Sequence, residues 1–182
     1  MKTRNIFISM LTVLLGSVSV WLLLGCPATG IDDADIFFVY ARNFAEGHGF
    51  VYNIGGEEVE GFTSMLWTLL CSGFAALVHP LEKPLLLLNV LFGAVAVGAC
   101  LKRTEQPGLF ILMLVAAPAW FAWCQLSLME TGLWCLLITL LGWAVVERRR
   151  GAILRLLPLL LVTRPESMLW GAWIVGLVLM RS

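Results

Sequence analysis

The chain carries very little charge for its length. Of its 182 residues, 13% are Asp, Glu, Lys or Arg and 60% are hydrophobic, and the formal net charge is zero. A soluble domain has about 25% charged residues, so this composition excludes an ordinary soluble fold. A nucleic-acid-binding surface needs a basic patch, which a zero net charge does not favour. We therefore expect an all-α membrane protein, with the lipid bilayer as a partner and no nucleic acid.

The usual patterns of metal-binding and disulfide-bonded proteins are missing as well. The five cysteines include no CxxC pair, and all except Cys26 lie in apolar runs, where a thiol behaves as a small hydrophobe. The only histidines, His48 and His79, lie at opposite ends of a hydrophobic run, which argues against a metal-binding pair. The sequence therefore predicts neither a disulfide framework nor a zinc site. Clustered carboxylates could hold a divalent cation, but no spacing demands one.

Long apolar runs follow one another along the chain. The first, residues 6–31, is long enough to cross a hydrocarbon core of about 30 Å as a helix. The others cover residues 62–78, 85–101, 107–146, 152–162 and 167–180. As one helix the run 107–146 would extend about 60 Å, so it must turn, near residues 125–132. The sequence predicts one polytopic helical domain over residues 1–182, with a first span in 1–31, a loop at 32–61 and further spans in 62–182.

Basic residues give this domain an orientation. Because they precede the first run, the positive-inside rule places the N-terminus in the cytoplasm and the loop 32–61 outside. A cleaved signal peptide is the competing interpretation, but its apolar core is shorter, about 7–15 residues. If the arginines at 148–150 are also cytoplasmic, Glu130 and Arg164 face the outside. Three apolar runs separate the loop from Glu130, where an even number of crossings is required, so one run must be re-entrant or interfacial.

More than half of the twelve acidic residues lie in one polar stretch, residues 32–67. An acidic triplet at its start supplies an N-cap and suits the helix dipole, and Gly47 provides a C′ stop, so we expect a helix from Asp32 to Glu46. Its aromatic residues favour a helix that lies in the headgroup region instead of crossing the membrane. Residues 50–61, which contain two adjacent glycines, predict a tight hairpin or an ordered loop. The polar chemistry is thus expected at the membrane surface.

Each polar residue of this stretch has a structural and a functional interpretation. Asp32 and Asp33 either cap the helix beside solvent or include a general base whose pKa is raised by low dielectric and a neighbouring carboxylate. Arg42 is either an i,i+4 partner of Glu46 or a clamp for phosphate. His48, between two glycines, is either a turn residue or a catalyst.

The remaining candidates lie where apolar runs begin or end. Glu60 ends the loop, and Thr63 or the serine after it caps the next helix. Glu130 is the only charged residue of its long apolar run, where an unpaired charge costs several kcal/mol, so function is the first explanation. For the Arg-Pro-Glu segment from Arg164 to Glu166, the alternatives are a plain interfacial turn and an arginine that meets an anionic headgroup.

Several motifs together resemble a known family. They are Asp32-Asp33-Ala34, Tyr40-Ala41-Arg42-Asn43, Gly47-His48-Gly49, Asn53, Gly55-Gly56-Glu57, Val59-Glu60-Gly61, Thr63, Leu66-Trp67, Met129-Glu130-Thr131 and Arg164-Pro165-Glu166. On these residues the chain resembles bacterial membrane glycosyltransferases of the GT-C type. It is similar to the terminal arabinofuranosyltransferases and related to the protein mannosyltransferase superfamily. The resemblance covers residues 32–166, and the long match in the first loop is its specific part.

The resemblance implies a function, a location and a set of site residues. Such enzymes are multi-pass proteins of the bacterial inner membrane that transfer a sugar, at the outer face, from a polyprenyl-phosphate donor to a hydroxyl of a cell-envelope glycan, lipid or protein. It places the catalytic base at Asp32, with Asp33 beside it, in an external or periplasmic first loop. The substrate-binding residues that it implies are Arg42, Asn43, His48, Asn53, Glu60, Thr63, Glu130, Arg164 and Glu166. Because a phosphate leaving group needs no proton, one base suffices for an inverting displacement.

The chain also departs from this family. Val39 stands where relatives often have arginine, Asp35 where an apolar residue is usual and Ser64 where asparagine is common. Family enzymes are usually several hundred residues long, so we expect the chain to be truncated relative to the family, to be a minimal enzyme, or to work with a second membrane subunit. The alternative function is a non-catalytic membrane subunit that binds lipid-linked sugar or a partner enzyme. A small transporter or channel is a third.

Overall fold

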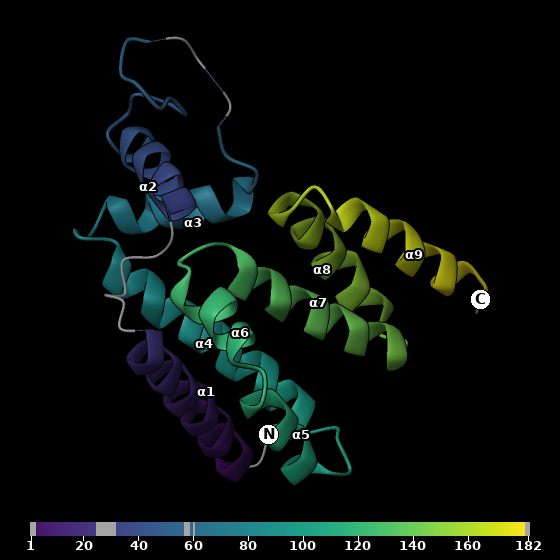
Figure 1. Ribbon diagram of the computed structural model, residues 1–182. Coiled ribbons are helices and arrows are strands. Elements are labelled where there is room, and N and C mark those ends of the chain that lie inside the picture. Colours follow the sequence, from purple (N-terminus) through teal and green to yellow (C-terminus); the bar gives the residue numbers. More distant parts are fainter. Residues whose placement is uncertain (1–2, 25–31, 57–58, 60, 181–182) are drawn as a thin grey trace.

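Every regular element in the described part of the chain is a helix (Figure 1), which confirms the all-α prediction. The computed structural model describes residues 3–24, 32–56, 59 and 61–180. The region expected to form a hairpin or an ordered loop contains no strand among its described residues. Instead, the N–H of Gly56 donates to the carbonyl of Asn53 at 3.1 Å, and Gly55 takes the positive φ (+75°) of a tight turn. The described residues of this region therefore contain a tight turn without paired strands, and residues 57, 58 and 60 lie outside the described part.

Two helices are long and apolar enough to cross a membrane. They are α1 (Thr3–Leu24), of which Asn5–Leu23 meets the length and hydropathy of a span, and α4 (Glu82–Leu101). These helices pack along each other (Figure 1), and Val13 of α1 is buried in a cluster with Val97 of α4. At 1.5 Å per residue, each is about 30 Å long, which matches the hydrocarbon core.

A third span is present only if a bent pair of helices crosses the membrane as a single span. This pair consists of α5 (Pro107–Val115) and the segment formed by α6 (Pro118–Phe121) and the π-helical turn η1 (Ala122–Leu126), and it bends by 77° at the break before Pro118. The other apolar helices are shorter than a span. The described part therefore contains two helices long and apolar enough to cross a membrane, or three if the bent pair counts as one span. This number is smaller than the number of spans that the apolar runs of the sequence suggested. The predicted turn inside the run 107–146 is confirmed, since η1 ends at Leu126 and the next helix begins at Thr131.

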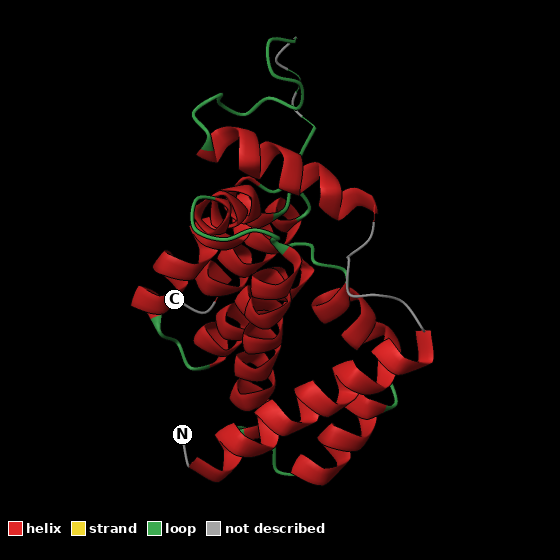
Figure 2. Ribbon diagram, turned by 90° about the vertical axis from the view of Figure 1, so that its left-hand side faces the viewer, coloured by secondary structure: helices red, strands yellow, loops and turns green. Residues whose placement is uncertain are grey.

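Helix α2 (Asp32–Ala45) ends as its glycine predicts. Gly47 adopts a φ of +87°, and the N–H groups of Gly47 and His48 donate to the carbonyls of Phe44 and Asn43 at 3.1 and 2.9 Å. These two bonds are the pair that defines a Schellman C-cap. The helix lies across the ends of the other helices (Figure 2) and packs on α3 (Met65–Ala75).

Three of the four aromatic residues of α2 face inward, and the fourth, Phe44, is exposed. Phe37, Phe38 and Tyr40 are buried in the main core cluster, which they share with Trp67 of α3. Of the two residues predicted to cap α3, Ser64 is the N-cap, because its hydroxyl oxygen accepts the N–H of Trp67 at 3.2 Å. Whether α2 lies in a headgroup layer stays a prediction.

The C-terminal part is formed by three consecutive helices, α7 (Thr131–Val146), α8 (Arg150–Thr163) and α9 (Ser167–Met180). Helix α8 returns beside α7 (Figure 1), and Leu137 and Leu141 of α7 belong to the same core cluster as Leu160 of α8. Burial of these leucines against α2, α3 and α4 unites the two halves of the chain around one core.

Candidate functional site

Two turns of the chain bring a buried carboxylate and a cation together. Glu130 directly precedes α7, and Arg164 directly follows α8. Arg164 is extended (φ −150°, ψ 139°) because the proline after it disfavours helical backbone, and this ends α8. Since α7 and α8 are antiparallel neighbours, the start of one and the end of the other coincide in space. The Nε of Arg164 lies 3.2 Å from Oε1 of Glu130.

Two further side chains contact the guanidinium of Arg164, and a third holds one of these two in place. Its Cζ lies 5.3 Å from the ring centroid of Trp134, one turn into α7, in the geometry of a cation–π contact. Trp134 is fixed in turn, because its Nε1 donates to the hydroxyl of Ser167 at 2.8 Å. In addition, Oε2 of Glu166 lies 3.6 Å from the Arg164 Nε. Arg164 is therefore positioned from α7 and from the start of α9 together.

The two carboxylates of this cluster differ in exposure. The side chain of Glu130 is 0% exposed, that of Arg164 28% and that of Glu166 60%. Water therefore reaches the arginine from the Glu166 side, while Glu130 forms the floor of the cluster. An anion that approached from solvent would meet Arg164 before it met Glu130.

The Glu130 to Arg164 contact is electrostatic and not a well-aligned hydrogen bond. Within the described residues, neither carboxylate oxygen of Glu130 nor the Nε of Arg164 has a hydrogen-bond partner. Buried polar atoms are nearly always satisfied by protein or by water, and a charged group left without such bonds is costly. These atoms are consequently the ones that a bound ligand or solvent molecule would use.

The environment of Glu130 changes its acidity. Burial raises the pKa of this carboxyl above its ordinary value, the charges of Glu166 and Asp33 raise it further, and Arg164 acts in the opposite direction. Glu130 lies in the turn before α7, outside the segments long enough to span a membrane. A carboxyl with a raised pKa next to a cation is suited to hold or exchange a proton.

The first turn of α2 contributes to the same region. The charge of Asp33 acts on Glu130, which places this exposed residue within electrostatic range of the buried carboxylate. Asp32 begins α2, and its side chain lies outside the described part of the chain. The structure thus brings Asp33, Glu130, Arg164 and Glu166 toward one another, although they are far apart in the sequence.

The other predicted site residues lie elsewhere. Arg42 is exposed in the last turn of α2, about 14 Å along the helix from Asp33, and no ion pair joins it to Glu46 among the described side chains. His48 is exposed in the C-cap turn, with its Nε2 3.9 Å from Oε2 of Glu46. Asn43 is buried and donates from its Nδ2 to two loop carbonyls, at 2.7 and 3.1 Å, so it holds the loop.

Three predicted residues remain in the loop and at its end. Asn53 is exposed in the tight turn, and Thr63 is exposed immediately before α3. Glu60 lies outside the described residues. Asn53 and Thr63 belong to the loop between α2 and α3, which extends away from the helices in Figure 1, whereas the Glu130 cluster lies where α7 begins and α8 ends.

Two buried amides near Glu130 were not anticipated from the sequence. Asn89 of α4 and Gln125 of η1 are both 0% exposed, and the Asn89 Nδ2 donates to the carbonyl of Met129 at 3.4 Å. Gly132 makes room for this cluster, since a Cβ there would lie 2.7 Å from the Asn89 Oδ1. The sequence did contain an indication of both amides, because each is an isolated polar residue in an apolar run.

The site combines a buried acid of raised pKa with a partly exposed cation. This pair can bind the phosphate of a ligand through Arg164 and move a proton at Glu130. Among the side chains that the structure describes, no three of His, Cys, Asp or Glu cluster closely enough to hold a metal ion. Comparison of the chain with protein-family models, with curated proteins and with solved structures finds no match.

Proposed function

We propose that the chain is a GT-C type membrane glycosyltransferase that moves a sugar from a polyprenyl-phosphate donor to a hydroxyl of a cell-envelope glycan, lipid or protein. The observation that carries the proposal is the contact of buried Glu130 with partly exposed Arg164, next to the acidic start of α2. Such a site offers an oriented cation for a departing phosphate, and the acidic start of α2 offers the carboxylates of Asp32 and Asp33 for a hydroxyl proton. The motif resemblance in residues 32–166 adds the substrate class.

The proposed reaction needs one base and one cation. The acceptor oxygen attacks the anomeric carbon of the donor sugar, and the bond from that carbon to the phosphate oxygen breaks with its electron pair. Asp32, with Asp33 beside it, takes the acceptor proton, and the polyprenyl phosphate leaves as an anion. Arg164 stabilises that anion, because its guanidinium is partly exposed and is fixed by Trp134. Glu130 and Glu166 orient the arginine.

The proposal includes an orientation in the membrane. We place the chain in a bacterial inner membrane, with the loop 32–61 and the Glu130 cluster at the outer face and the arginines at 148–150 in the cytoplasm. The short helix α3 supplies the non-crossing segment that this orientation requires, and α4 and the bent pair from Pro107 to Leu126 then make the two crossings between the loop and Glu130. On this arrangement the polyprenyl chain of the donor stays in lipid while its phosphate reaches Arg164.

A second candidate function is a non-catalytic subunit that binds lipid-linked sugar or a partner enzyme. It is favoured by the separation of the loop residues Arg42, His48 and Asn53 from the Glu130 cluster, since one small ligand would not contact both sets. A binding subunit needs the cation at Arg164 and the loop surface, but no base.

Sugar transfer by the purified chain in nanodiscs, with a panel of radiolabelled polyprenyl-phosphate sugars, tests the proposal. We expect Asp32→Asn to lower transfer by about 10²- to 10⁴-fold, the contribution of a positioned base. Asp35→Asn is the matched control, because Asp35 is an exposed carboxylate in the same helical turn and has no role in the reaction. Unchanged transfer by Asp32→Asn would refute the assignment. Donor binding without transfer by the folded wild-type chain would favour the binding subunit.

A further inference from the structure

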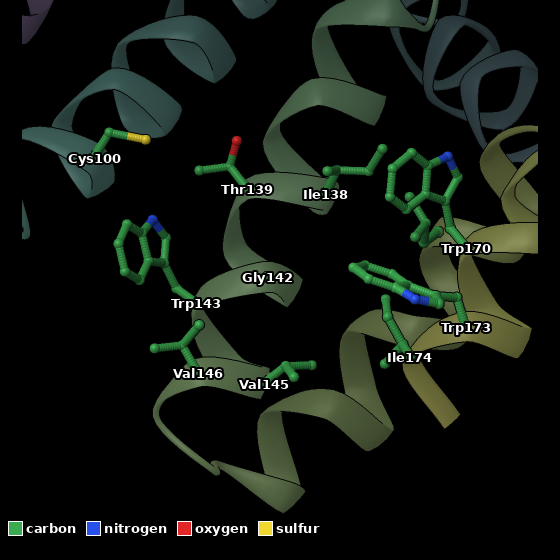
Figure 3. A pocket seen from close by; sticks show the side chains of 11 residues that line it. Cys100, Ile138, Thr139, Gly142, Trp143, Val145, Val146, Trp170, Trp173 and Ile174 are labelled. Carbon is green, nitrogen blue, oxygen red and sulfur yellow. The ribbon is translucent and has the colours of Figure 1, made fainter. Parts of the chain in front are cut away.

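An apolar groove lies between α7 and α9, near the ends of α4 and α7 that are remote from Glu130. Its volume is about 570 Å³, within the range of about 300–1,000 Å³ typical of ligand sites. Figure 3 shows the indoles of Trp170 and Trp173 on α9 along one side of it, and Trp143 with Val146 on α7 along another. Its lining is almost entirely apolar, so the part of a ligand that occupies it must be a hydrocarbon or an aromatic group.

Basic residues adjoin this groove where α4 and α7 end. Lys102 and Arg103 follow the groove-lining Cys100 almost directly, and the arginines at 148–150 come just after Val146. We call these five residues the basic cluster. A cation–π contact joins the cluster to the groove, since the Cζ of Arg103 lies 5.0 Å from the ring centroid of Trp143.

The basic cluster keeps an excess of positive charge. Glu147 accepts two of its cations, with Oε1 2.6 Å from the Arg103 Nε and Oε2 2.7 Å from the Arg149 Nε. The single carboxylate of Glu147 thus forms ion pairs with two guanidinium groups. Within the described part of the chain, Lys102, Arg148 and Arg150 are exposed and form no ion pair with a carboxylate. The cluster therefore attracts an anion that lies at the mouth of the groove.

We propose that this end of the molecule binds one anionic phospholipid, with an acyl chain in the groove and the phosphate at the basic cluster. Charge complementarity selects this occupant, because a zwitterionic lipid fills the groove equally well but gains no net attraction from the cations. The tryptophans match the position of an interfacial belt, with their rings beside the acyl chain. The site is separate from the Glu130 cluster, and the inference does not depend on sugar transfer.

Two substitutions test the two halves of this site. Gly142 lines the groove, and a Cβ built on it has no atom within 4 Å, so Gly142→Leu fills the groove without a clash at its Cβ. Its matched control is Gly73→Leu, at an exposed helical glycine of α3 whose Cβ is equally free. For charge, Lys102→Gln with Arg150→Gln removes two of the three cations that form no ion pair, and Lys83→Gln removes an exposed cation at the opposite end of α4.

Native mass spectrometry of the detergent-purified chain, titrated with phosphatidylglycerol or with phosphatidylcholine of the same acyl chains, gives the measurement. We expect one phosphatidylglycerol to be retained in preference to phosphatidylcholine. Gly142→Leu should abolish this retention, and the double glutamine variant should weaken it roughly thirtyfold, about fivefold for each cation. Both controls should bind like the wild type. Equal retention of the two lipids, or unchanged retention by Gly142→Leu, would overturn the proposal.

Discussion

Removal of the Arg164 charge should destabilise the fold in a pH-dependent way. In Arg164→Gln, Glu130 stays 0% exposed and loses the one cation 3.2 Å from its oxygen. Breaking a fully buried ion pair costs about 3–5 kcal/mol. Because the Arg164 side chain is 28% exposed, water already shares its interactions. We therefore expect a loss of about 2–3 kcal/mol in unfolding free energy at neutral pH.

The sign of the pH dependence follows from the raised pKa of Glu130. Between its ordinary pKa and its raised pKa, the folded chain binds more protons than the unfolded chain, so stability falls as pH rises through this window. Arg164 opposes this effect, and its loss raises the pKa of Glu130 further. The cost of Arg164→Gln should therefore be small at acidic pH, where Glu130 is neutral, and should grow as pH rises.

Thermal unfolding in detergent at several pH values measures this cost. A loss of about 2–3 kcal/mol corresponds to a lower melting temperature by about 4–12 °C for a chain of this size. Glu130→Gln in the Arg164→Gln background should restore most of the stability and remove its pH dependence, because no buried charge then remains. Lys83→Gln, at an exposed cation outside any ion pair of the described residues, is the control. A cost that does not vary with pH, or that persists in the double variant, would refute the reasoning.

Two other substitutions, each compared with a control substitution, have expected outcomes that follow directly from the packing. Gly132→Ala places a Cβ 2.5 Å from the backbone carbonyl of Cys124, so we expect a loss of about 1–3 kcal/mol by thermal unfolding. Gly142→Ala, in the same helix with nothing within 4 Å, should be neutral or stabilising by up to about 1 kcal/mol. Asn43→Ala removes two hydrogen bonds to loop carbonyls and should cost about 1–3 kcal/mol. It should also accelerate proteolysis within residues 46–62, whereas Asn53→Ala, at an exposed side chain, should not.

Much of the helical architecture could be predicted from the lengths of the apolar runs and from the glycines and prolines at which helices end or bend. Gly47 identified the end of α2 because only a residue that tolerates positive φ suits a Schellman cap there. Length alone required the turn between η1 and α7. The 77° break before Pro118 was also signalled by that proline, yet uniform hydrophobicity around it concealed the boundary.

The site was harder to predict from the sequence than the helices were. Glu130 and Arg164 were identifiable as isolated charges in apolar surroundings, and a topological argument placed them on one side. Their contact depends on how tightly α7 and α8 pack, which no local pattern encodes. The contact of Trp134 with Arg164 was also not predictable from the sequence, because an indole in an apolar helix is ordinarily a core residue. Only the position of Arg164 over its ring distinguishes it.

The distribution of charge along α7 connects these observations. Buried Glu130 at its start depends on a single, partly exposed arginine, whereas Glu147 at its end is shared by two arginines near solvent. A ligand phosphate that engages Arg164 would therefore compete directly with Glu130, and the released carboxylate would favour its protonated form as its pKa rises further. At the Glu147 end the spare cations allow an anion to bind without displacing the internal partner. The same residue types thus make one end of the helix responsive to a ligand and the other end suited to stable attachment.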